Sequence, residues 1–138
     1  MIYDLRVSLG MWGLDPEFDL ARLQIVQSAL QAIAREAYAR HPELASVYAS
    51  CRYHWRSSAS GMGDECADVA ACIERGWGDC ADLSPARAAE LEVRHGLQAA
   101  TLIIEQPDDE QGRARGHVVV VTPHFTEDPA LAVGMTEE

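Results

Sequence analysis

The sequence predicts an α+β domain in which helices pack on a small antiparallel sheet, and three patterns support that prediction. Apolar residues recur at helical spacing from residue 16 to about residue 40. A second helix-forming run follows Cys80 and ends at Gly96. Two strand patterns, at residues 99–106 and 117–123, come only after these helices. Helices followed by a run of strands are typical of α+β folds, whereas α/β folds alternate the two.

The length and charge of the chain exclude several classes of protein. The 138 residues are most simply one domain, with an N-terminal strand and long helix in residues 1–45 and the rest of the core in residues 46–138. The formal net charge of −11 argues against a nucleic-acid partner, which needs a basic face. Because we find neither a signal peptide nor a membrane-spanning apolar run, we expect a cytoplasmic protein with reduced cysteines and no membrane partner.

The first half of the chain predicts one strand, one long helix and one extended segment. Residues 3–9 alternate apolar and polar side chains, as a half-buried strand does. Asp15 is a candidate N-cap and Pro16 stands at the first helical position, so a helix should begin there and run to about Arg40. Residues 46–56 are rich in β-branched and aromatic side chains, which favours a short strand or an extended segment.

The second half predicts two helices and two strands. Residues 57–65 have the composition of a loop and lead into a short helix around Glu65 to Glu74. A Gly-Trp-Gly turn then precedes the helix that ends at His95. The strand at residues 99–106 is separated by a polar loop from "HVVVVTP", which reads as a strand buried on both faces or nearly so.

Cys80 stands between the Gly-Trp-Gly turn and the following helix, where a thiolate would be stabilised. A helix N-terminus and a neighbouring imidazolium both lower a cysteine pKa, so we expect the pKa of Cys80 to lie below the free value of about 8.5. The turn glycines would let the backbone approach a substrate carbonyl closely, with the Cys80 N–H as one oxyanion donor. The alternative is that Cys80 is a small apolar residue in a helix–helix contact, which is the commoner role of a free cysteine.

His117 and Asp128 are candidates for the base and the orienting carboxylate that Cys80 would need. His117 follows Gly116 and opens a strongly apolar strand, where the sheet could fix its side chain beside a cleft. A turn and a returning strand would bring Asp128 back to the imidazole. Cysteine, histidine and aspartate in this order match a nucleophile, its base and the residue that orients the base. His124 is an alternative base, but we expect it in an exposed turn.

Four stretches of the chain together resemble one family. "RGWGDCADLSPARAAEL", "GHVVVV" and "EDPALAVGM" resemble the transglutaminase-like cysteine-protease superfamily, most closely its small bacteriophage and prophage members. "VYASCRYHWR" is similar to the extended segment that precedes the catalytic helix in those phage proteins. The resemblance covers residues 46–135 and implies a papain-like fold, with the cysteine on a helix packed against an antiparallel sheet. It makes Cys80 the nucleophile, His117 the general base and Asp128 the residue that orients the imidazole.

Two features depart from the family pattern. Ser84–Pro85 has the local signature of an N-cap and a first-turn proline, which would start the regular helix about four residues after Cys80. We therefore expect a distorted first turn. A second oxyanion donor is also not obvious from the sequence. Trp55 and Trp77 are the candidate substrate-binding residues because an indole N–H could serve, with core packing as the alternative for each.

These residues predict an enzyme that transfers the acyl group of an amide substrate through a Cys80 thioester. Resolution by water would make the protein a peptidase, isopeptidase or amidase, and resolution by an amine would make it a transglutaminase-type cross-linking enzyme. The alternative is a non-catalytic phage virion or assembly protein that retains the fold. We expect a protein or peptide substrate as partner, and the phage resemblance adds virion proteins as partners and the host cytoplasm or the virion as the location.

A metal site is the remaining alternative for the cysteines. Cys66, Cys72 and Cys80, with His54, could be imagined around zinc, but their spacing fits none of the usual zinc motifs. Cys66 and Cys72 fall six residues apart in a predicted helix and would lie on different faces of it. We therefore expect core cysteines, no metal and no cofactor.

Overall fold

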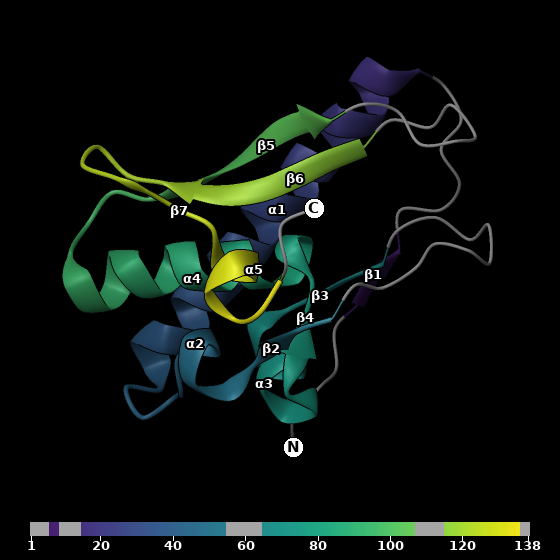
Figure 1. Ribbon diagram of the computed structural model, residues 1–138. Coiled ribbons are helices and arrows are strands. Elements are labelled where there is room, and N and C mark those ends of the chain that lie inside the picture. Colours follow the sequence, from purple (N-terminus) through teal and green to yellow (C-terminus); the bar gives the residue numbers. More distant parts are fainter. Residues whose placement is uncertain (1–5, 9–14, 55–64, 107–114, 136–138) are drawn as a thin grey trace.

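The three-stranded sheet lies on one side of two packed helices. The computed structural model describes residues 6–8, 15–54, 65–106 and 115–135. Helices α1 (Pro16–Arg40) and α4 (Cys80–His95) pack together under an antiparallel sheet with the strand order β5-β6-β7 (Figure 1). Its strands are β5 (Ala100–Gln106), β6 (Arg115–Val121) and β7 (Thr126–Glu127). The α+β prediction, with helices packed on a small antiparallel sheet, is confirmed.

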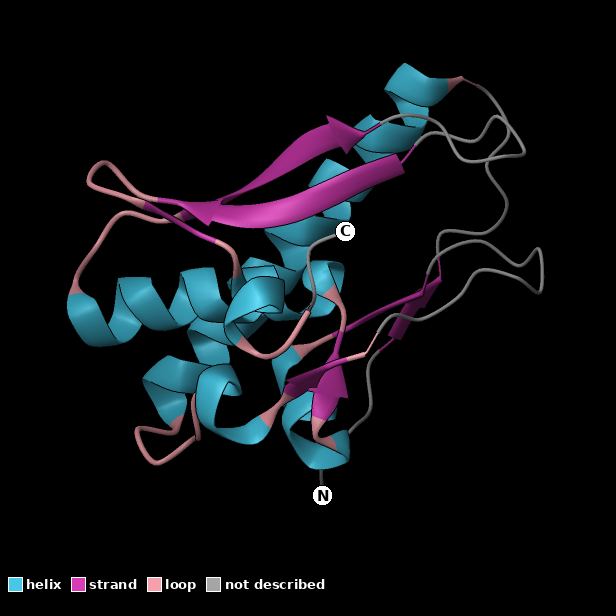
Figure 2. Ribbon diagram, in the orientation of Figure 1, coloured by secondary structure: helices cyan, strands magenta, loops and turns pink. Residues whose placement is uncertain are grey.

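Most of the shorter elements lie on the side of α1 and α4 away from the sheet, and the final helical turn contacts both α4 and β6 (Figure 2). The shorter elements are two helices, two two-stranded ladders and this final helical turn. In chain order these elements are β1 (Arg6–Ser8), α2 (Val47–Ser50), β2 (Arg52–Tyr53), β3 (Glu65–Ala67), α3 (Val69–Arg75), β4 (Trp77–Gly78) and α5 (Pro129–Ala132). Strands β1 and β3 pair antiparallel, and β2 and β4 pair parallel. None of the helices in the described ranges is long and apolar enough to span a bilayer.

Helix α1 has the boundaries that the sequence predicted. The Asp15 side chain accepts a hydrogen bond from the backbone N–H of Phe18, and Pro16 occupies the first turn, where a missing N–H costs nothing. The helix ends at Arg40, just before His41–Pro42. Its buried side chains, Tyr38 among them, pack against α3 and α4.

Two predicted elements differ from the structure because polar side chains cap helices there. Ser46 caps α2 by accepting from the N–H of Tyr48, so residues 47–50 are helical and the described strand of this segment is only Arg52–Tyr53. Asp68 caps α3 in the same way, so that helix begins at Val69 rather than near residue 65. Residues 65–67 instead pair with β1, which places Cys66 on a strand and corrects its predicted helical position.

Helix α4 begins at Cys80, so the local signature of Ser84–Pro85 does not mark the start of the helix. Asp79 caps the helix and forms a capping box with Asp82, a stronger local signal than the later Ser-Pro pair. Pro85 lies inside the helix and lacks the N–H that would bond the carbonyl of Ala81. The buried Gln27 of α1 supplies that hydrogen bond instead, with its Nε2 2.9 Å from the Ala81 oxygen. At its other end α4 stops at Gly96, in the left-handed region, as predicted.

The central strand β6 is buried as the sequence predicted. Val118, Val119 and Val120 are each at most 3% exposed. Strand β5 pairs with all seven residues of β6, whereas β7 pairs only with Val120 and Val121. Strand β7 therefore leaves the backbone of Val118 open to other partners.

Candidate active site

The structure brings His117 and Asp128 together. Nε2 of His117 lies 2.7 Å from Oδ2 of Asp128, and both side chains are about four-fifths buried. The β6–β7 turn explains the contact, because the pairing of Val120 with Glu127 returns the chain alongside β6 just before Asp128. With Nε2 engaged by the carboxylate, Nδ1 is the ring nitrogen that remains for a substrate or a nucleophile.

Gly116 allows β6 to reach this position beside β5. A Cβ atom at residue 116 would lie 2.7 Å from Cγ2 of Ile103, a distance that such atoms do not tolerate. The glycine therefore permits the close approach of the two strands immediately before His117.

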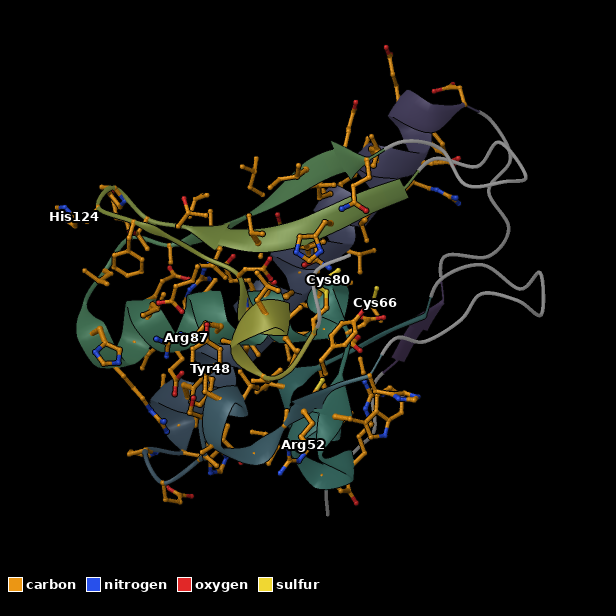
Figure 3. All side chains as sticks on the ribbon, viewed as in Figure 1. Tyr48, Arg52, Cys66, Cys80, Arg87 and His124 are labelled. Carbon is orange, nitrogen blue, oxygen red and sulfur yellow. The ribbon has the colours of Figure 1, made fainter. Side chains whose placement is uncertain are left out.

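Cys80 lies on the first turn of α4, directly beside β6 (Figure 3). Because β7 does not reach Val118, side chains of α4 bond the backbone there. The Ser84 hydroxyl donates to the Val118 carbonyl at 2.9 Å, and the Val118 N–H donates to the Cys80 sulfur. Cys80 is thus held against the residue that follows His117 in the chain, and it packs in the cluster that contains Val118.

The expected low pKa of Cys80 is not found. Burial is the largest influence and, with the charges of Asp79, Asp82 and Asp128, raises the pKa of Cys80 to about 12, although the Val118 N–H opposes the shift. The helix N-terminus gives little help because the Asp79 carboxylate already accepts from the N–H groups of Ala81 and Asp82. The resting thiol is therefore protonated at neutral pH.

Of the two candidate substrate-binding tryptophans, the structure describes Trp77 but not Trp55. Trp77 is half-buried, with the Arg75 guanidinium 3.6 Å above its ring and the His54 ring in edge contact at 4.9 Å. Its role in substrate binding stays a prediction. Trp55 lies outside the described residues. Gly78, between Trp77 and Cys80, does not expose the backbone to a substrate, because a Cβ there would meet Asp82 and Leu83 of α4.

The other three cysteines are core residues. Cys51, Cys66 and Cys72 are each at most 5% exposed. Burial raises the pKa of Cys51 to about 11 and raises that of Cys72 as well. In the described ranges no group of three or more histidine, cysteine or acidic side chains could hold a metal ion.

His124 does not take part in the arrangement around Cys80. It is exposed at the tip of the β6–β7 turn and points away from Cys80 in Figure 3. Of the two histidines considered as bases, only His117 contacts Asp128.

Tyr53 is a residue of this region that the sequence analysis did not single out. It lies on β2, whose parallel pairing with β4 places Tyr53 opposite Gly78, two residues before Cys80. The phenol is close enough to Cys80, Asp79 and Asp128 for their charges to add to burial in raising its pKa to about 12. Because residues distant in sequence make this arrangement, the motif "CRYHW" alone could not reveal it.

A second unpredicted feature is an ionic network that fixes the segment before Asp128. The Arg87 guanidinium lies 2.9 Å and 3.3 Å from the two Glu127 oxygens and 2.6 Å from Glu90. It also stacks 4.4 Å from the ring of Tyr48, whose hydroxyl donates to Glu127 (Figure 3). Burial opposes ionisation of Glu127, but the hydrogen bonds from Arg87 and Tyr48 lower its pKa.

Taken together, a thiol, an imidazole with an oriented ring and a carboxylate lie at one edge of the sheet where α4 begins. The imidazole can accept a proton at Nδ1, and the carboxylate can stabilise the resulting imidazolium. The chain matches no protein-family model, no curated protein and no solved structure.

Proposed function

We propose that the protein is a cysteine enzyme of papain-like fold that transfers the acyl group of an amide through a Cys80 thioester. The observation that carries the proposal is the 2.7 Å contact between His117 and Asp128, made beside the strand residue that hydrogen-bonds Cys80. A buried histidine–aspartate pair orients a base, and the Cys80 thiol is a nucleophilic side chain that bonds the backbone of the next residue, Val118.

The raised pKa of Cys80 favours proton transfer during attack over a preformed thiolate. His117 takes the thiol proton at Nδ1 as the Cys80 sulfur bonds to the amide carbon, and the carbonyl electrons move to oxygen. The imidazolium then gives that proton to the amine nitrogen as the C–N bond breaks, leaving the thioester. Water or an amine, deprotonated by His117, attacks the thioester carbon and releases Cys80, which regains the proton.

The test uses p-nitrophenyl acetate as an acyl donor and locates the acetyl group by peptide mass mapping. We expect the wild-type protein to be acetylated at Cys80. The Cys80→Ser variant should no longer release p-nitrophenol. His117→Gln should lose nearly all of the rate, whereas His124→Gln, its matched control in the exposed turn, should keep it. Acetylation of the four cysteines at similar rates would contradict the proposal.

One observation favours a second function. A thiol with a pKa of about 12, surrounded by carboxylates, also suits a non-catalytic virion or assembly protein that keeps the fold without turnover. In that case His117→Gln would leave the acetylation rate of Cys80 unchanged. The same experiment therefore separates the two functions.

A further inference from the structure

The backbone of Tyr53 joins the two segments that carry the proposed nucleophile and carboxylate. Its N–H donates to the carbonyl of Val133, just after α5, at 3.0 Å. On the other side, the N–H of His54 donates to the carbonyl of Gly78 at 2.9 Å, just before Cys80. Strand β2 therefore lies between the start of α4 and the helical turn capped by Asp128, and Tyr53 is fixed at that point.

The hydroxyl of Tyr53 is available as a hydrogen-bond donor. The side chain is half-buried, and no described residue is a hydrogen-bond partner of this hydroxyl. Burial, followed by the negative charges of Cys80, Asp79 and Asp128, raises its pKa to about 12, so the phenol keeps its proton throughout the neutral range. A phenol that keeps its proton can donate a hydrogen bond to an anion that forms near these carboxylates.

The backbone N–H of Cys80 lies in the same region. Cys80 is the first residue of α4, and the N–H groups of a first helical turn have no partner within the helix. The Asp79 side chain accepts from Ala81 and Asp82, which leaves the Cys80 N–H out of the cap.

We infer that the Tyr53 hydroxyl is a catalytic hydrogen-bond donor that, together with the Cys80 backbone N–H, stabilises the oxyanion of the tetrahedral intermediate. The inference rests on the proposed function and supplies the second donor that the sequence did not reveal. Attack on the carbonyl converts its oxygen to an alkoxide, which would otherwise lie next to Asp79 and Asp128 without a compensating charge. The phenol hydrogen bond strengthens as that charge develops and weakens when the thioester forms.

The test compares two reactions of Cys80 in Tyr53→Phe. Acetylation by p-nitrophenyl acetate passes through an oxyanion, whereas alkylation by iodoacetamide displaces iodide without one. We expect the acetylation rate to fall about tenfold to a thousandfold, the range for loss of one such donor, while the alkylation rate stays at the wild-type value. Tyr38→Phe is the matched control, because it removes a buried hydroxyl bonded to the Ala45 carbonyl within the core and should change neither rate.

The outcomes separate the inference from the proposed function. If Tyr53→Phe acetylates at the wild-type rate while Cys80→Ser is inert, the inference is wrong and the proposed function stands. If acetylation and alkylation fall together, Tyr53 acts on the thiol and not on the oxyanion, which also overturns the inference. If the wild-type protein shows no Cys80-dependent acetylation, the proposed function fails and the inference with it. Circular dichroism of the isosteric Phe variant checks that the fold is retained.

Discussion

Oδ2 of Asp128 lies 2.7 Å from Nε2 of His117, while the other carboxylate oxygen of Asp128 caps α5 by accepting from the Leu131 N–H at 3.3 Å. The Asp128 side chain thus both caps α5, directly after β7, and orients the His117 ring. Each contact fits a different role for Asp128, that of a structural cap and that of a triad carboxylate. The geometry is compatible with both, so the two roles must be separated by experiment.

Asp128→Asn should separate the roles. Asparagine is as good an N-cap as aspartate, so we expect little change in the free energy of unfolding. An amide has one acceptor oxygen and no charge, so it cannot cap α5 and stabilise the His117 imidazolium at once. We expect the acetylation rate of Cys80 to fall about tenfold to a thousandfold, less than the loss of about 10⁴ known for a serine triad.

The control for Asp128→Asn is Asp15→Asn, which makes the same change at the N-cap of α1, away from the site. Its acetylation rate should equal that of the wild type. An Asp128→Asn protein that folds and acetylates at full rate would leave Asp128 as a structural cap only.

Arg87→Gln should destabilise the protein and loosen the segment that carries Asp128. The substitution removes an arginine that is 15% exposed and pairs with Glu127 and with Glu90, itself 3% exposed. Removing one partner of a fully buried ion pair costs roughly 3 to 5 kcal/mol, and because the Arg87 and Glu127 side chains are 15% and 23% exposed we expect about 2 to 4 kcal/mol by urea unfolding. Because Glu127 immediately precedes Asp128, we also expect slower acetylation of Cys80 under folded conditions.

Arg40→Gln provides the comparison for Arg87→Gln. The Arg40 and Glu36 side chains on α1 are largely exposed, at 72% and 64%. Removing this ion pair should therefore lower the free energy of unfolding by at most about 0.5 kcal/mol. Equal effects of the two substitutions on the free energy of unfolding would show that the Arg87 network contributes no more than a surface pair.

The elements that the sequence predicted well are those with local signals. Helix α1 follows from Asp15 and Pro16, and the end of α4 follows from Gly96, because capping depends on a few adjacent residues. The apolar run of β6 and its burial were likewise evident. His117 and Asp128 could be matched by chain order and resemblance, and their contact agrees with that expectation.

What the sequence did not predict depends on contacts between distant residues. Strand β3 forms because residues 65–67 pair with β1, and no local sequence pattern predicts that pairing. The pKa of Cys80 was misjudged because burial in the folded core outweighs the helix N-terminus, whose N–H groups Asp79 already occupies. The position of Tyr53 could not be predicted from nearby residues, because β2 is positioned by its contacts with β4 and with the segment after α5.

Alkaline pH should destabilise the protein through its buried thiols. The pKa of Cys51 is raised to about 11 in the fold, above the unfolded value of about 8.5, so between these values the unfolded state releases a proton that the folded state keeps. The unfolded state then binds fewer protons, and the free energy of unfolding decreases as pH rises. For Cys51 the loss between pH 7 and pH 10 is on the order of 1 to 2 kcal/mol.

Urea unfolding at both pH values measures this loss, and Cys51→Ala assigns it. The side chain of Cys51 is in the core at 5% exposure, so the variant should be less stable at pH 7 but should lose less stability between pH 7 and pH 10. A pH-dependent loss in Cys51→Ala as large as that of the wild type would show that the Cys51 thiol does not titrate as described.

Gln27 and Pro85 should be energetically coupled although they lie on different helices. Pro85 leaves the Ala81 carbonyl without its helical donor, and Gln27 supplies one from α1 at 2.9 Å. Gln27→Met removes that donor and leaves a buried carbonyl unsatisfied, whereas in the Pro85→Ala background the restored N–H of residue 85 can bond Ala81 within α4. Gln27→Met should therefore cost about 1 kcal/mol less in the Pro85→Ala background than in the wild type.

A double-mutant cycle in urea measures this coupling, and Gln31 provides its control. Gln31 is also a buried glutamine of α1. It donates to the Ala99 carbonyl at 2.8 Å and to the Glu92 carboxylate near the end of α4, but not to the first turn of that helix. Gln31→Met and Pro85→Ala should therefore be additive, because they share no hydrogen-bonding partner. If Gln27→Met and Pro85→Ala are additive as well, Gln27 does not compensate for the proline, and the first turn of α4, which carries Cys80, is held by its cap, by β6 and by the bonds of Asp82 to Ala67 and Arg75.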